Sequence, residues 1–286
     1  MAKAFPDHPF LRGYYAPLHM ECDADHLPIT GEMPKELCGT LYRNGPNPQF
    51  APRGFYHWFA GDGMLHAFHV EDGRVSYRNR WVRTPKWELE NKAGEALIGV
   101  VWHGDRLLAL EEAHAPFEVD AKTLMPKGYR DWDGQVGKFT AHPKIDPHTG
   151  DMVAFAYAAS GRFTPEIDII VVGADGTLKR KERFSAPYSS MIHDFVVTER
   201  WIILPVFPLT GSIERAMKGQ PAFAWEPDKG THVALIPRDG TVADVKWITG
   251  DACYVFHPLN AFDGADGKIV CDMMKYPVAP LFPRPD

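Results

Sequence analysis

The sequence lacks the features of membrane-spanning, secreted disulfide-rich and zinc-finger proteins. No uninterrupted apolar run approaches the ~18 residues that cross a bilayer, and residues 1–8 contain no apolar segment of a signal peptide. The four cysteines, Cys22, Cys38, Cys253 and Cys271, form no CxxC pair. That spacing disfavours structural zinc and a disulfide framework. We therefore expect a reducing, cytoplasmic location.

The chain also lacks a long basic run. Its 31 Lys and Arg against 37 Asp and Glu give a formal net charge of −6. Nucleic acid is therefore not an expected partner, and nothing in the pattern indicates membrane association. The 286 residues are 45% hydrophobic, which is enough to bury a sizeable core.

Helical patterns are scarce. The 25 glycines, the 25 prolines and the 12% aromatic content favour many short strands joined by turns. After residue 100, only residues 211–218 predict a helix, with Ser212 as its cap. Residues 1–30 show no sustained apolar period and are expected to be irregular. The fold class is therefore all-β, and the repeated hairpin units favour a propeller over a sandwich or barrel.

One histidine stands at the entrance of a predicted hairpin. The apolar runs 195–197 and 201–204 flank a turn, and His193 comes just before the first of them. A histidine at this place lies at the rim of a sheet, where metal and substrate sites are commonly assembled.

Two further histidines have the same setting. His142 precedes a turn and the apolar run 152–156, and His257 follows residues 252–256 (ACYVF). The three histidines are 51 and 64 residues apart, close to the roughly 40–50 residues of a propeller blade. Because equivalent positions of successive blades converge on an axis, we expect the three imidazoles to meet at one metal. Residue types alone allow iron, copper, zinc or nickel.

Three segments carry a resemblance to a known family. Residues 42–48 (YRNGPNP), 57–66 (HWFAGDGMLH) and 141–147 (AHPKIDP) are similar to segments of the carotenoid cleavage oxygenases. That family includes lignostilbene dioxygenases and a retinoid isomerohydrolase, and the resemblance runs from about residue 9 to residue 286.

The resemblance implies a seven-bladed propeller with a non-haem iron(II), Fe(2+), held by four histidines. His142, His193 and His257 match the first three, and no histidine follows His257. The expected structure is a single domain over residues 1–286, an incomplete propeller of about four to five blades that lacks the family's C-terminal part.

Glu112 matches a family glutamate that orients a ligand histidine. Its neighbour Glu111 stands where stilbene-cleaving members usually have a lysine, which leaves the substrate open. Taken alone, a histidine before a strand, or a carboxylate on one, is more often structural than catalytic. Asp62 and Asp194 are a conceivable carboxylate pair for hydrolysis, although no spacing ties them together.

The function implied by the resemblance is cleavage of a conjugated C=C bond by dioxygen. The expected substrate is an apolar apocarotenoid or stilbene, and two carbonyl compounds are the products. One alternative is an inactive or non-catalytic propeller fragment that has lost full metal binding. A calcium-dependent propeller lactonase is disfavoured, because its site would need carboxylate and amide ligands where this chain has histidines.

Overall fold

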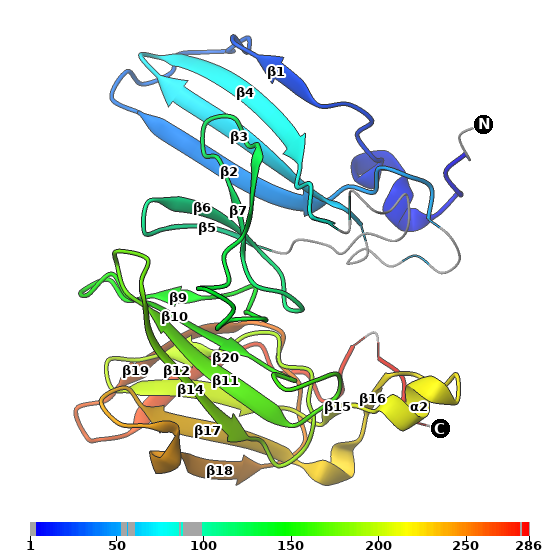
Figure 1. Cartoon of the computed structure of the whole chain (residues 1–286), viewed down its shortest axis with the longest axis vertical. Coiled ribbons are helices and arrows are strands. Elements are labelled where there is room, and N and C mark those ends of the chain that lie inside the picture. Colours follow the sequence, from blue (N-terminus) through cyan, green and yellow to red (C-terminus); the bar gives the residue numbers. More distant parts are fainter. Residues whose placement is uncertain are drawn as a thin grey trace. The chain divides into compact units, whose positions relative to one another are not determined.

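The computed structural model describes residues 4–52, 56, 61–85, 87, 99–280 and 282–285. Over these residues most of the regular structure is β-strand (Figure 1). The helical elements are short: η1 (Pro9–Leu11), η2 (Gly13–Tyr15), α2 (Ile213–Met217), η4 (Pro227–Lys229) and η5 (Val242–Asp244). Among the described residues, none of the helices has both the length and the apolar character that crossing a bilayer requires.

The chain divides into two compact units, and each is described by itself. Unit 1 comprises residues 1–111 and 115–131, and unit 2 comprises residues 112–114 and 132–286. The single domain over residues 1–286 remains a prediction from the sequence.

Unit 1 consists of two four-stranded antiparallel sheets. The first has the order β1-β4-β3-β2 and is formed by β1 (Cys22–Ala24), β2 (Gly39–Pro46), β3 (Gly63–Glu71) and β4 (Arg74–Trp81). The second is a meander of β5 (Gly99–His103), β6 (Arg106–Leu110), β7 (Phe117–Val119) and β8 (Pro126–Tyr129).

One face of each sheet in unit 1 is buried. Leu65 and Ala67 of β3 share a core with Leu107 and Ala109 of β6 and with Phe117 of β7. Because residues two apart on a strand face the same side, these residues form one buried face on each sheet, and β6 and β7 are buried on their other face as well. The two sheets therefore pack against each other through these faces.

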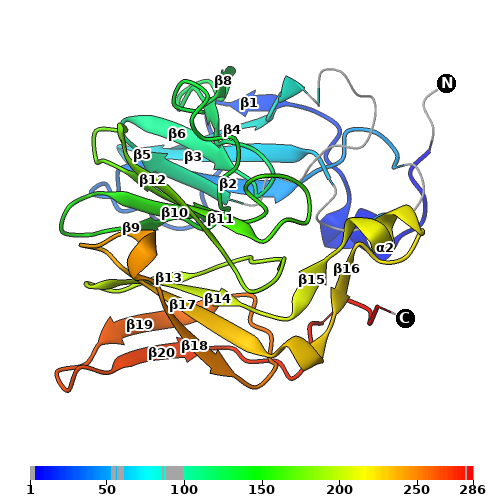
Figure 2. The ribbon, with the colours of Figure 1, turned by 60° about the horizontal axis from the view of Figure 1, so that its bottom comes forward.

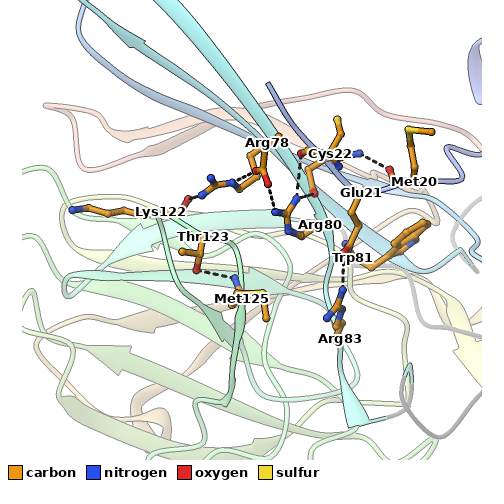
Figure 3. Close-up of polar contacts among 12 residues, drawn as sticks. Met20, Glu21, Cys22, Arg78, Arg80, Trp81, Arg83, Lys122, Thr123 and Met125 are labelled. Atoms are coloured by element: carbon orange, nitrogen blue, oxygen red, sulfur yellow. Dashed lines mark hydrogen bonds and ion pairs between the residues drawn. The ribbon is translucent and has the colours of Figure 1, made fainter. Parts of the chain in front are cut away.

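The N-terminal segment is held to this unit by a short edge strand. Residues 1–30 are predicted to be irregular, but β1 pairs with β4 in an antiparallel ladder. Figure 3 shows the side chains that fasten it: Arg80 donates to the carbonyl of Cys22 (3.2 Å), and Arg83 pairs with Glu21 (2.6 Å). Three residues are too few to show a strand period, so the prediction is wrong here.

Unit 2 contains two four-stranded antiparallel sheets and two hairpins. The first sheet is a meander of β9 (Lys144–Ile145), β10 (Met152–Ala156), β11 (Glu166–Val172) and β12 (Leu178–Ser185). The second has the order β13-β14-β17-β18 and is formed by β13 (Val196–Val197), β14 (Trp201–Val206), β17 (Thr231–Pro237) and β18 (Lys246–Gly250). The hairpins are β15 (Leu209–Gly211) with β16 (Phe223–Trp225), and β19 (Pro258–Asp263) with β20 (Ile269–Met273).

The two sheets of unit 2 enclose a common core. Phe155 of β10 and Phe195, just before β13, are fully buried there, and their ring centroids are 5.1 Å apart. Hairpin β19–β20 lies beside the second sheet on its other side, where β13 and β19 are in contact (Figure 2). Successive parts of the chain are thus stacked as layers within this unit.

The local predictions in this unit are confirmed. The hairpin predicted at 195–204 is β13–β14, in which Val196 pairs with Ile203. Helix α2 begins after Ser212, whose side chain accepts a hydrogen bond from the amide of Arg215. Four-stranded antiparallel sheets in succession are the blades of a propeller. The described residues form four such sheets and the two-stranded β19–β20, in line with the predicted four to five blades.

Candidate metal centre

The three predicted histidines occupy the same place in successive sheets of unit 2. His142 lies two residues before β9, His193 three residues before β13, and His257 immediately before β19. Each of these strands is the first of its sheet along the chain. The chain therefore delivers one imidazole to the rim at the start of each repeated unit.

The three imidazoles come together. The Nε2 atoms of His142 and His193 are 3.0 Å apart. One ligand nitrogen from each of His142, His193 and His257 can be chosen so that all lie within 4.8 Å of one another. The ring centroids are 4.6 to 4.9 Å apart, and the rings are inclined by 68° to 80°. The predicted convergence of the three side chains is confirmed.

Burial differs among the three histidines. His193 is buried and His142 is half-buried, whereas the side chain of His257 is 56% exposed. Burial, together with the nearby imidazole of His193, lowers the pKa of His142 to about 4. At neutral pH His142 therefore carries no charge and keeps a lone pair for a metal.

Glu112 lies behind His193. Its Oε1 is 2.5 Å from Nδ1 of His193, and its Oε2 accepts a hydrogen bond from the hydroxyl of Tyr157 at 2.7 Å. Because an ionised carboxylate only accepts, Nδ1 of His193 is the donor of this bond, and in the neutral ring Nε2 then has the lone pair. Burial and the Glu112 carboxylate raise the pKa of Tyr157, so its hydroxyl stays protonated. The geometry is the one predicted for Glu112.

A second carboxylate, that of Asp194, has contacts that the sequence did not predict. Asp194 is buried, accepts a hydrogen bond from the ammonium of Lys144 at 2.7 Å, and lies 3.4 Å from Nδ1 of His257. Asp62 has a different partner: its carboxylate accepts from the backbone amide of Gln49. The sequence places both residues beside predicted ligands: Asp194 directly follows His193, and Lys144 is two residues after His142. This position was the one feature that could have identified them.

The arrangement fits a transition-metal ion. Two nitrogens bound at right angles, ~2.1 Å from one metal, are ~3.0 Å apart, which is the separation between the Nε2 atoms of His142 and His193. The ligand nitrogens that are farthest apart are 4.8 Å from each other. Movements of ~1 Å by these nitrogens would bring both within bonding distance of one metal. Carboxylate partners on the distal nitrogens are the usual support for imidazole ligands.

Two histidines of β3 have other partners. In β3, His66 stacks on Tyr77, and its Nδ1 is 2.7 Å from that hydroxyl. His69 is bonded to the hydroxyl of Thr40 at 2.8 Å. Residues 57–60 of the family-like segment 57–66 lie outside the described residues.

Comparison with known proteins identifies the family. Residues 15–285 match the family described as retinal pigment epithelial membrane protein (RPE65). The chain is 36% identical, over 311 aligned positions, to isoeugenol monooxygenase of Pseudomonas nitroreducens, and the match covers all of this chain and 65% of that protein. The chain therefore belongs to the RPE65 and carotenoid oxygenase family, as its sequence predicts.

Solved structures agree with this assignment. Lignostilbene dioxygenase of Pseudomonas brassicacearum matches 99% of this chain and 65% of its own, with a TM-score of 0.92 and 36% identity. Cobalt-substituted apocarotenoid oxygenase (ACO) of Synechocystis matches 92% of this chain and 63% of its own, with a TM-score of 0.80 and 29% identity. The chain thus spans less than two thirds of the length of these relatives.

Proposed function

We propose that this chain contributes His142, His193 and His257 to a non-haem iron(II) centre. The centre would serve a dioxygenase that cleaves a conjugated C=C bond into two carbonyl products. The observation that carries the proposal is the convergence of three imidazole nitrogens within 4.8 Å, with a carboxylate bonded to the distal nitrogen of His193. Iron is the metal used by the family that the sequence resembles, and imidazoles are suitable ligands for it.

The bound metal would supply dioxygen activation, and the residues of this chain prepare the site for it. Burial keeps His142 neutral at physiological pH. Glu112 fixes the ring and the tautomer of His193, so that Nε2 is directed toward the other imidazoles. Neutral imidazole ligands would leave the metal its full positive charge. The carboxylates of Glu112 and Asp194, which lie behind His193 and His257, would balance that charge.

The proposed substrate is an apolar aryl alkene of the stilbene or phenylpropenoid type. Isoeugenol monooxygenase and lignostilbene dioxygenase, which are named for such compounds, are each 36% identical to this chain, and the apocarotenoid oxygenase is 29% identical. Dioxygen and one C=C bond give two C=O groups without a further reductant. An apocarotenoid is the second substrate to test.

The test measures bound metal and product together. The purified chain is loaded with Fe(II) without oxygen, desalted and assayed for iron. It is then given oxygen with isoeugenol, a hydroxystilbene or an apocarotenal, and aldehyde products are quantified. We expect one iron per chain, and at least a tenfold loss of retained iron in His142→Ala and His193→Ala.

His148→Ala is the matched control, because His148 is exposed on the turn after β9. A chain that retains no iron, or whose iron content is unchanged in His142→Ala and His193→Ala, contradicts the proposed centre. Iron retained through these histidines without any aldehyde product favours the alternative of a non-catalytic propeller.

A further inference from the structure

An ion pair with a buried carboxylate lies next to the histidine cluster. The ammonium of Lys144 is 2.7 Å from Oδ1 of Asp194, whose side chain is 5% exposed. The same oxygen accepts the backbone amide of Phe195 at 2.8 Å, and the Lys144 ammonium lies 5.6 Å from the centre of the Phe195 ring. These contacts give the buried Asp194 carboxylate its partners, while the Lys144 side chain is 32% exposed.

This pair connects two different sheets. Lys144 begins β9 of the β9–β12 sheet, and Asp194 lies just before β13 of the next sheet. Lys144 is two residues from His142, and Asp194 adjoins His193. A single ion pair therefore spans the two loops whose histidine Nε2 atoms are 3.0 Å apart.

The second oxygen of Asp194 reaches the third loop. Oδ2 lies 3.4 Å from Nδ1 of His257, whose side chain is 56% exposed and thus has little packing to fix its rotamer. The Lys144 ammonium holds the Asp194 carboxylate from the other side. Asp194 consequently contacts elements that carry each of the three histidines.

We infer that Lys144 and Asp194 are positioning residues that set the separation of the three histidines and hold His257 toward a metal. The inference rests on the proposed metal centre. Without the pair, the loops at His142 and His193 keep their apolar core but lose the polar connection that fixes their distance. His257 loses the one carboxylate that touches its ring among the described residues.

Another ion pair in unit 2 that has a buried carboxylate provides a matched control. Arg183 of β12 donates two hydrogen bonds, at 2.6 and 2.9 Å, to Asp168 of β11, whose side chain is 6% exposed. This pair lies within one sheet, on neighbouring strands. Loss of either ion pair should lower stability, but only loss of the first should alter a metal site.

The experiment uses Co(II) as a spectroscopic probe on the full 286-residue chain. Binding is titrated by visible absorption for wild type, Lys144→Met, Asp194→Asn, the double variant, Lys144→Arg and the control Arg183→Met. We expect a 10–100-fold loss of Co(II) affinity and a shifted absorption band in Lys144→Met, in Asp194→Asn and in the double variant. Lys144→Arg should recover most of the affinity, and Arg183→Met should match wild type in both readouts.

The outcomes separate this inference from the metal centre itself. If wild type binds Co(II) through His142 but Lys144→Met and Asp194→Asn keep its affinity and spectrum, the inference is wrong and the centre stands. If wild type binds no Co(II), or His142→Ala binds it equally well, both are wrong. If Asp194→Asn fails to fold, the double variant Lys144→Met/Asp194→Asn replaces it in the test, because it leaves no charge without its partner. Co(II) affinity and absorption of the double variant equal to those of wild type would overturn the inference.

Discussion

Replacing Glu112 should weaken both the fold and the metal centre, by amounts that its contacts define. Glu112 is the acceptor for two donors, Nδ1 of His193 at 2.5 Å and the hydroxyl of Tyr157 at 2.7 Å. Its own side chain is 12% exposed, and that of His193 is 7% exposed. Glu112→Ala leaves two buried donors without their acceptor, at about 1–3 kcal/mol each, or about 2–6 kcal/mol in total.

Glu112→Gln should lower the free energy of unfolding by less than Glu112→Ala does. The amide oxygen still accepts from His193, and the Tyr157 hydroxyl can rotate to accept from the amide nitrogen. The loss is then the charge-assisted part of the two bonds, about 1–2 kcal/mol. Tyr157→Phe is the matched comparison, since it removes one donor and leaves the bond between Glu112 and His193, at about 1 kcal/mol.

The assay is chemical unfolding of the metal-free chain, followed by Co(II) titration of the folded protein. We expect the free energy of unfolding to fall in the order Tyr157→Phe, Glu112→Gln, Glu112→Ala. Metal affinity should fall 10–100-fold in the two Glu112 variants. A Glu112→Ala protein within about 0.5 kcal/mol of wild type, with unchanged Co(II) affinity, would refute the reasoning.

Three further predictions concern the supporting structure. The hydrogen bond from Arg238, together with those from the backbone amides of His148 and Thr149, lowers the pKa of Asp146 to about 2. The ionised carboxylate should therefore add about 1–2 kcal/mol to the free energy of unfolding above pH ~4, and this contribution is lost as the pH falls from ~4 through ~2. Arg238→Met should reduce that part of a stability–pH profile. Phe195→Ala, in the fully buried core, should reduce the free energy of unfolding by about 3–5 kcal/mol in urea. At Gly211 an added Cβ would lie 2.4 Å from Cδ1 of Phe163, so Gly211→Ala should cost about 1–3 kcal/mol, and Phe163→Leu should recover part of it in a double-mutant cycle.

The sequence was most informative where a pattern repeats. Hairpin β13–β14 follows from two apolar runs around a turn, and the histidines follow from their shared place before a strand. Strand β1 was not predictable, because its three residues have no period and pair with residues 53 to 57 positions away. Asp194 was missed for a related reason. Its partners Lys144 and His257 lie 50 and 63 residues away, and neighbouring residues do not reveal such distant contacts.

The spacing of the histidines also has a consequence for folding kinetics. The strand pairs β9–β10, β11–β12 and β13–β14 join segments close in sequence and can form early, because short loops close at low entropic cost. The contact between His142 and His193 closes a loop of 51 residues, and the contact between Asp194 and His257 closes a loop of 63 residues. The cluster is therefore complete only after three successive hairpin units have docked. A bound metal should slow the unfolding of unit 2 and leave its folding rate nearly unchanged.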